Sequence, residues 1–111
     1  MATSKEFADY ALQQLHLLSE VAYRKMMGEY VLYYRGKVVG GFYDNRLLLK
    51  ATPSVLTHLS QGELVIPYPG AKEMFFVPDL QDPQWLKELV EPMFLELPFP
   101  QKRSKKKPSV R

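Results

Sequence analysis

The residue types that most often carry catalytic chemistry are scarce in this sequence and form no catalytic pattern. The chain has no cysteine, which excludes disulfides, thiolate catalysis and cysteine-ligated zinc. Its two histidines, His16 and His58, are too few for a multi-histidine metal site. Serine and acidic residues occur, but no nucleophile elbow, paired acid motif or metal-spaced cluster is visible. We therefore predict no catalytic residue, no metal site, no cofactor and no enzymatic activity.

The segment Tyr68–Lys72 is the loop best suited to contact a ligand, because it combines an aromatic ring and a lysine with a stiff Pro-Gly turn. It is not a phosphate-binding loop, since it has one glycine and no Ser or Thr follows Lys72 to hold magnesium. The simpler interpretation is a structural crossover between two strands. The alternative is a small-ligand or enzyme site that uses Tyr68 and Lys72.

A second candidate surface begins at the cluster Arg24-Lys25-Met26-Met27-Gly28, whose basic side chains could bind an anion or an acidic partner. The plainer interpretation is that the methionines pack and the basic side chains are solvated. Strand alternation places Arg24 and Lys25 on opposite faces, so both are not expected to serve one site. Tyr30 opens the next strand, Tyr30–Tyr34, which is apolar on both faces and is therefore central or used by a partner. The interaction candidates are Arg24, Lys25, Met27, Tyr30, Tyr68 and Lys72.

The basic charge of the chain is concentrated at its C-terminal end. Six of the 15 Lys and Arg residues follow Pro100 with no acid among them, so the sequence pI of about 9.1 reflects a tail. We expect residues 99–111 to be disordered, and they could bind nucleic acid in a salt-sensitive, sequence-independent way. A solubilising terminus explains the same composition, and the lack of aromatics after Phe99 weakens a base-stacking model. The nucleic-acid candidates are Lys102, Arg103, Lys105, Lys106 and Lys107.

The candidate residues must be held in place by a fold, and the pattern of apolar residues predicts one α+β domain over residues 1–98. The composition of the whole chain, 46% hydrophobic and 13% aromatic, is too apolar for a disordered protein. We predict an antiparallel sheet of about five strands with helices packed on it, in the order α-β-β-β-α-β-β-α. Thr3-Ser4-Lys5-Glu6 fits a capping box that starts the first helix. The apolar face of that helix is predicted to contain Phe7, Tyr10, Ala11, Leu15 and Leu18.

Turn residues, helix caps and prolines predict where the other helices and strands begin and end. Arg35-Gly36 and Asp44-Asn45 are turn pairs. Gly40-Gly41 inside a strand indicates a bulge or a close backbone approach by a helix or by another chain. Thr52-Pro53 and Asp82-Pro83 resemble helix starts, each with an N-cap followed by proline. The helix that begins at Pro53 is expected to run to about Leu59. Pro92 should kink or divide the last helix.

Nothing in the sequence resembles a membrane span, and we predict no membrane partner, although the basic tail could also bind an anionic membrane. The longest apolar runs have four to six residues, against the roughly 20 that a spanning helix needs. The N-terminus MATSKEF lacks the apolar core of a signal peptide, so we expect a cytoplasmic protein.

Several short motifs, in this order along residues 5–98, resemble the TfoX/Sxy N-terminal domain family. They are the cluster at residues 24–28, the Glu29-Tyr30 step, the hairpin glycine Gly36, the strand start Asp44–Lys50 and the loop entry Pro67-Tyr68. The resemblance implies a secretion-chaperone-like α/β sandwich of a kind that often dimerises. Full-length members are regarded as regulators of natural competence that act with a cyclic-AMP receptor protein and carry a second, helical C-terminal domain.

This sequence ends where that second domain would begin, so the competence role is not carried across. Our leading hypothesis is a non-enzymatic, homodimeric interaction domain that contacts a protein partner such as a transcription regulator. The alternatives are a nucleic-acid-associating accessory protein that uses the basic tail, and a small-ligand binder or enzyme that uses the Tyr68–Lys72 loop.

Overall fold

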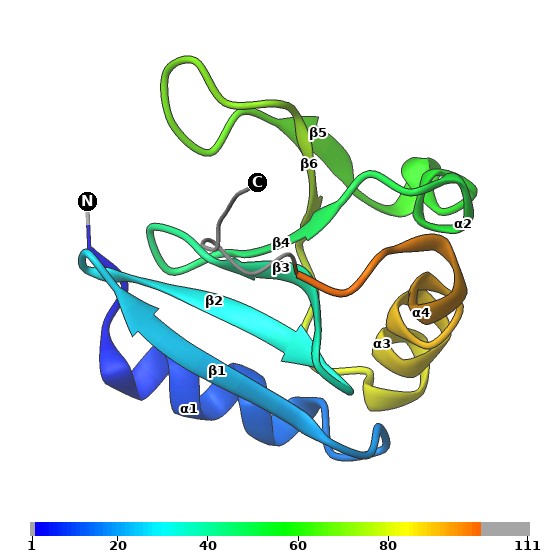
Figure 1. Cartoon of the computed structure of the whole chain (residues 1–111), viewed down its shortest axis with the longest axis horizontal. Helices are drawn as coiled ribbons and strands as arrows, with labels where there is room; N and C mark the ends of the chain where they lie inside the picture. Colours follow the sequence, from blue (N-terminus) through cyan, green and yellow to red (C-terminus); the bar gives the residue numbers. More distant parts are fainter. Residues whose placement is uncertain (1, 101–111) are drawn as a thin grey trace, which may run out of the picture.

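The computed structural model describes residues 2–100 and shows one six-stranded antiparallel sheet with helices packed against it (Figure 1). The elements in chain order are α1 (Lys5–Gln14), β1 (Val21–Met26), β2 (Glu29–Tyr34), β3 (Lys37–Phe42), β4 (Leu47–Lys50), α2 (Pro53–Leu56), the 3-10 turn η1 (Leu59–Gln61), β5 (Glu63–Val65), β6 (Met74–Val77), α3 (Pro83–Val90) and α4 (Met93–Glu96). The predicted α+β class is confirmed. The sheet has one strand more than expected, because the segment around Val21 pairs with β2 along its whole length.

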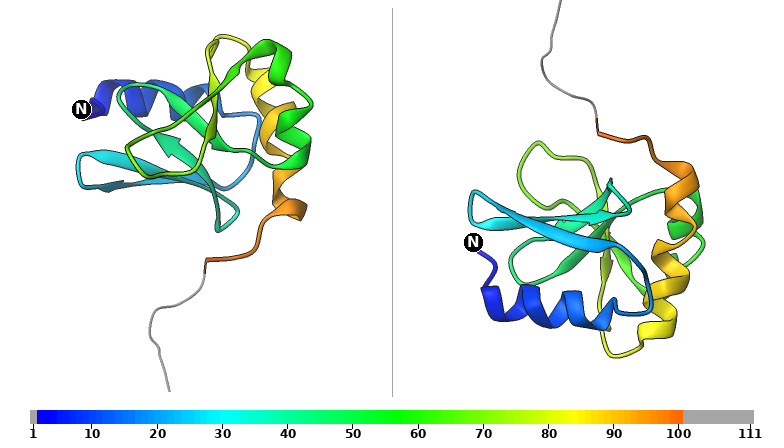
Figure 2. Two further views of the ribbon diagram at one scale, coloured as in Figure 1. Left: turned by 90° about the horizontal axis from the view of Figure 1, so that it is seen from above. Right: turned by 60° about the horizontal axis from the view of Figure 1, so that its bottom comes forward.

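The strand order is β1-β2-β3-β4-β6-β5, which leaves β1 and β5 as the two edges. Figure 2 shows α1 as a separate layer on one side of β1 and β2, while α3 and α4 lie at the end of the sheet. One core fills the space between the sheet and these helices. The sheet residues in this core are Tyr30, Leu32, Tyr34, Val39, Phe42, Leu47, Leu49, Phe75 and Val77, and the helix residues are Ala8, Ala11, Val55, Leu86, Leu89, Val90 and Met93.

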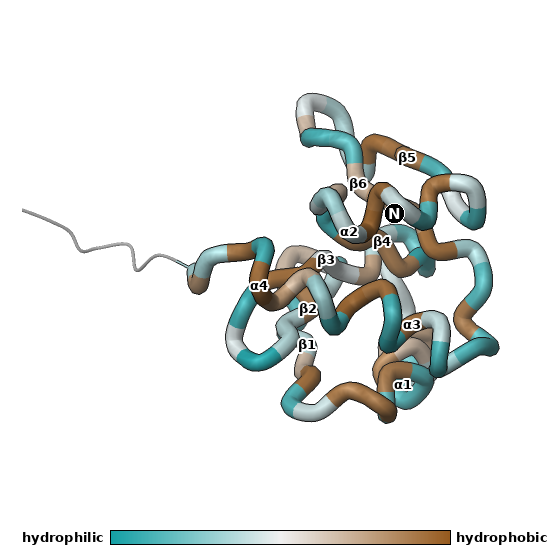
Figure 3. Tube along the Cα trace, turned by 90° about the vertical axis from the view of Figure 1, so that its right-hand side faces the viewer, coloured by the Kyte–Doolittle hydropathy of each residue, from teal (hydrophilic) through white to brown (hydrophobic). Residues whose placement is uncertain are grey.

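The alternation of side chains along the strands defines two faces of the sheet, which we name the inner face, toward the helices, and the outer face. On β4, Leu47 and Leu49 belong to the core, so Leu48 between them points to the outer face. Leu48 is fully buried even so, which shows that the outer face is itself partly apolar. Figure 3 shows apolar stretches in the strands and helices and largely hydrophilic connecting loops.

The first helix begins where the capping signal predicts it, and of the five residues predicted for its apolar face all but Tyr10 pack in or against the core. Ser4 is the N-cap, and its hydroxyl accepts from the Phe7 amide at 3.0 Å. Ala8 and Ala11 are buried, whereas Tyr10 is 41% exposed, so its place in the predicted apolar face is wrong. Successive helical residues are about 100° apart, and this puts Tyr10 on the side away from Ala8.

Three tight hairpins connect the first four strands, and each has both central residues in the left-handed region. Arg35 and Gly36 have φ of 52° and 86°, and Asp44 and Asn45 have φ of 54° and 58°. Such pairs form type I′ turns, whose twist matches that of the flanking strands. Both predicted turns are confirmed. The third hairpin, between β1 and β2, uses Met27-Gly28 in the same way.

The two glycines in β3 allow the backbones of neighbouring strands to approach closely. A Cβ on Gly40 would lie 2.1 Å from the Leu48 carbonyl oxygen, and one on Gly41 would lie 2.3 Å from the Tyr30 carbonyl oxygen. The register between β2 and β3 also shifts after Leu32, as in a β-bulge. The predicted bulge is therefore present, but the close approach comes from the neighbouring strands β2 and β4 and not from a helix or another chain.

Side-chain caps start the later helices as predicted. Thr52 accepts from the Val55 amide at α2, and Asp82 accepts from the Trp85 amide at 3.2 Å at α3. Helix α2 ends at Leu56 rather than near Leu59, where the separate turn η1 begins. Pro92 divides α3 from α4, because it offers no amide hydrogen to continue the helix.

Glu96 connects the end of α4 to the start of α2. The Ser54 hydroxyl donates to its Oε1 at 2.7 Å, and the Ser54 amide donates to its Oε2 at 3.1 Å. These bonds, the hydroxyl bond foremost, hold the pKa of Glu96 below its ordinary value of 4.5. A carboxylate with a lowered folded-state pKa stabilises the fold above the unfolded-state pKa, and this contribution is lost as pH falls through the folded-state value.

We therefore expect Glu96→Gln to lower the free energy of unfolding at pH 7 by up to about 1 kcal/mol, and by much less at pH 3. Urea unfolding at the two pH values, followed by the fluorescence of Trp85, measures the difference. Glu91→Gln is the matched control, since that exposed carboxylate accepts no hydrogen bond among residues 2–100. A loss of equal size at both pH values would show that the charge of Glu96 is unimportant.

Candidate functional site

The outer face of the sheet carries an open groove beside the loop that joins β5 to β6. Its volume is about 490 Å³. The residues that matter to its chemistry are Val38, Tyr43, Lys50, Tyr68, Lys72 and Met74. A second depression of about 360 Å³ adjoins it, sharing Tyr43, Pro67 and Tyr68, and extends to Met26 and Met27 at the β1–β2 turn. We name the two together the outer groove.

The wall formed by the β5–β6 loop has a defined backbone. The Ala71 amide donates to the Tyr68 carbonyl oxygen at 3.1 Å, with Pro69 and Gly70 between them and Gly70 at φ +88°. This is the pattern of a type II turn, in which proline presets the first central residue and glycine accepts the positive φ of the second. The loop that joins the strands, as predicted, therefore also holds Tyr68 over the outer groove.

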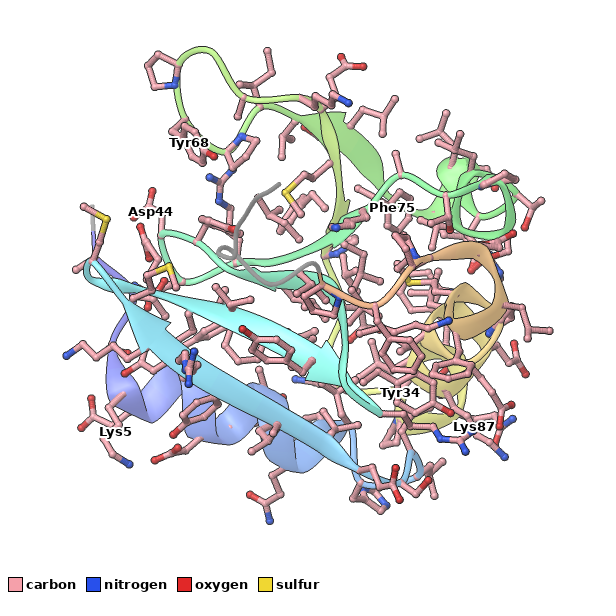
Figure 4. All side chains as sticks on the ribbon, in the orientation of Figure 1. Lys5, Tyr34, Asp44, Tyr68, Phe75 and Lys87 are labelled. Carbon is pink, nitrogen blue, oxygen red and sulfur yellow. The ribbon has the colours of Figure 1, made fainter. Side chains whose placement is uncertain are left out.

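Two tyrosines form the middle of the outer groove. The rings of Tyr43 and Tyr68 have centroids 6.4 Å apart and planes inclined by 45°. Figure 4 shows Tyr68 under its loop, on the side of the β3–β4 turn that carries Asp44. Burial raises the pKa of the Tyr43 hydroxyl above its ordinary value of 10, and the nearby Tyr68 and Glu29 add to the shift. At neutral pH the Tyr43 phenol is therefore a hydrogen-bond donor.

The structure brings three of the interaction candidates to this groove. Met27 is 97% exposed at the β1–β2 turn, and Tyr68 and Lys72 lie on the loop across from it. Tyr30 borders the groove but is only 3% exposed. Its ring packs 4.9 Å from that of Tyr23, so its main contacts are in the core.

Arg24 and Lys25 lie on β1, at an edge of the sheet. Arg24 pairs with Val31 and Lys25 with Tyr30, which places the two side chains on opposite faces. An edge strand presents unpaired amides and carbonyls, and charged side chains on it discourage pairing with another chain. Protection of this edge explains both residues without a ligand.

The double variant Arg24→Val with Lys25→Val is therefore expected to associate through β1. Its weight-average mass in light scattering should exceed that of the wild type at equal concentration and rise further with concentration. Glu88→Val with Glu91→Val removes as many exposed charges at the C-terminal end of α3, which has no free strand edge, and should leave the mass unchanged. Equal masses for the wild type and the β1 variant would remove the edge-protection role.

Lys37 is a buried residue that the sequence did not reveal. It is 9% exposed, and its Nζ donates to the Phe94 carbonyl oxygen at 2.6 Å. The same ammonium lies 3.9 Å from the ring centroid of Phe94 and 4.8 Å from that of Phe99, both cation–π distances. Phe99 also lies against Gly36, where an added Cβ would be 3.5 Å from its ring. These partners are more than 55 residues away in the sequence, so no local pattern could indicate them.

The basic tail candidates Lys102, Arg103, Lys105, Lys106 and Lys107 lie outside the described residues. Within residues 2–100, no group of three or more histidine or acidic side chains is placed to hold a metal ion. In the same range, no helix combines the length and apolar character needed to cross a bilayer.

One further depression, of about 320 Å³, lies at the start of α3. Its carboxylates have local partners: Asp82 caps α3, and Asp79 accepts from the Gln81 amide at 2.8 Å. The Trp85 indole donates to Nδ1 of His58 at 3.2 Å. These polar groups are accounted for by the fold, so the outer groove is the better candidate site.

Comparison with known proteins gives the family. The family model described as the TfoX N-terminal domain matches residues 13–92. An uncharacterised 12.7 kDa protein encoded in the trpE 5′ region of Spirochaeta aurantia is 35% identical over 107 residues, which cover 96% of this chain and 93% of that protein. No solved structure shows a significant match. The chain therefore belongs to the TfoX N-terminal domain family.

Proposed function

We propose that this chain is a non-enzymatic interaction domain of the cytoplasm that acts through protein contacts in transcription-related regulation. The observation that carries the proposal is the outer groove, bordered by exposed apolar side chains that the fold does not use. Met27, Tyr68 and Met26 are 97%, 58% and 48% exposed. Apolar groups gathered on one exposed surface are typical of a contact site for another molecule. The TfoX N-terminal domain is a regulatory type of family, and this supports a role in transcription-related regulation.

The shape of the outer groove favours a protein over a small molecule as its ligand. Small-molecule sites usually enclose most of the ligand surface. Both depressions are open to solvent, and they continue into each other past Tyr43 and Tyr68. A long, open surface of this kind can receive a segment of another chain.

Photo-crosslinking in the native host tests the proposal. The full chain is produced with p-benzoylphenylalanine in place of Met27 or of Tyr68, and adducts formed on irradiation are identified by mass spectrometry. We expect both positions to give adducts with the same regulatory or transcriptional protein. The matched control is the same replacement at Tyr10, which is 41% exposed on α1, outside the outer groove, and should not give that adduct.

Two results would count against the proposal. Adducts confined to metabolic enzymes would contradict a regulatory role. Identical adducts from Tyr10 and from the groove positions would show that the outer groove is not the contact surface.

A further inference from the structure

We propose that the outer groove binds an acidic segment of a partner protein, in which at least one carboxylate lies next to an aromatic or aliphatic side chain. This inference deepens the proposed function, on which it rests, by naming the chemistry of the partner. It follows from the distribution of charge, of hydrogen-bond donors and of apolar area in the groove.

The first argument is the presence of two lysines without acidic partners. Lys50 at the end of β4 and Lys72 in the β5–β6 loop both line the larger depression and are exposed. Among residues 2–100 the ion pairs are Lys5 with Asp9 and Arg35 with Glu20, so neither groove lysine takes part in one. Two unpaired ammonium groups on one surface favour a ligand with negative charge.

The second argument is that other donors lie beside these lysines. The hydroxyls of Tyr43 and Tyr68 are available at the middle of the outer groove. The Arg46 Nε donates to the main-chain carbonyl oxygen of Tyr43 at 3.3 Å, so the Arg46 side chain lies next to the main chain of that tyrosine. Among the residues that the structure describes, Glu73 is the one acid that lines the larger depression beside the two lysines, so the charge balance there is positive. Glu29 lines the smaller depression, where the Thr3 hydroxyl and the Asp44 amide donate to its carboxylate.

The third argument concerns the apolar part of the ligand. Val38 and Met74 lie on the outer face and line the same depression as the lysines, and both are half-buried. Met27 and Pro67 extend the apolar surface toward the β1–β2 turn. A purely ionic ligand would leave this area in water, whereas a peptide with an apolar residue next to its carboxylate would cover it.

A phage library of random 12-residue peptides, selected on the full chain, provides the test. Because the basic C-terminal residues could also attract acidic peptides, each round includes counter-selection on the full-length double variant Lys50→Glu with Lys72→Glu, which keeps those residues. We expect enriched peptides to share Asp or Glu next to an aromatic or aliphatic residue. Each should bind the wild type at least about tenfold more tightly than the double variant, as the loss of two charge pairs implies.

Lys25→Glu is the control for a charge reversal outside the outer groove, because it reverses one lysine charge on the opposite face of β1 and should bind within about twofold of the wild type. Lys50→Gln with Lys72→Gln should weaken binding without repulsion, and equal urea midpoints for all variants exclude a folding defect. Enriched peptides without an acidic preference, or with equal affinity for the wild type and the Lys50→Glu, Lys72→Glu variant, would overturn the proposal. So would the finding that the groove joins two copies of this chain and that no peptide is enriched.

The selection and the photo-crosslinking experiment fail independently. A regulatory adduct without an acidic preference would remove this inference and leave the proposed function. Acidic peptides that bind the groove, together with adducts confined to metabolic enzymes, would support the acidic-segment inference and contradict the regulatory role.

Discussion

Gly40→Ala is expected to lower the free energy of unfolding by more than about 4 kcal/mol, a large part of the roughly 5 to 15 kcal/mol of a typical domain. The new Cβ would lie 2.1 Å from the Leu48 carbonyl oxygen and 2.9 Å from the Leu49 Cα. Both atoms belong to the backbone of β4, so no side chain can move aside. The strands must separate, and the pairing of Gly40 with Leu49 between β3 and β4 is lost.

Urea unfolding followed by circular dichroism measures this effect, and Gly70→Ala provides the control. Gly70 has φ of +88° but no atom within 4 Å of an added Cβ, so its substitution costs only the backbone strain, about 1 to 2 kcal/mol. The comparison separates the cost of a steric clash with the backbone of β4 from the cost of placing alanine at a positive φ. If the two alanine variants have the same midpoint, the contact between β3 and β4 is looser than the structure shows.

The features predicted correctly from the sequence are those decided by a few neighbouring residues. The Asp44-Asn45 turn and the Asp82 cap each depend on groups within four positions of one another. Gly40 could be singled out because a glycine inside a strand is costly unless something lies close to it. The error at Tyr10 arose where the apolar spacing of α1 allowed more than one face, and the packing of Ala8 against the sheet decided between them.

The outer groove could be predicted only in parts. Met27 and Tyr68 could each be identified as exposed candidates, but their common surface depends on the placement of β6 between β4 and β5. That placement is set by pairing between strands distant in the sequence, such as Leu48 with Phe76. The two lysines illustrate the consequence, because Lys72 could be predicted as a candidate from its loop, whereas Lys50 became one only through its position on the outer face.

Lys37→Glu is expected to lower the free energy of unfolding by about 3 to 5 kcal/mol, the cost of an uncompensated buried charge. In the wild type the ammonium lies over the electron-rich faces of Phe94 and Phe99 and donates to the Phe94 carbonyl oxygen. A carboxylate at the same place would face those rings and that oxygen with the wrong sign, and it has no hydrogen to donate. The prediction is measured as a shift of the urea midpoint.

Two further variants determine which property of Lys37 is responsible. Lys37→Met keeps most of the apolar stem and removes the charge, so it should cost about 1 to 2 kcal/mol from the lost cation–π contacts and hydrogen bond. Lys50→Glu makes the same reversal at an exposed site and should stay within about 0.5 kcal/mol of the wild type. If Lys37→Glu were no more harmful than Lys50→Glu, the segment that carries Phe99 would not be held against Gly36. If Lys37→Met were as harmful as Lys37→Glu, the positive charge itself would be essential there, because the repulsion of the carboxylate would add nothing.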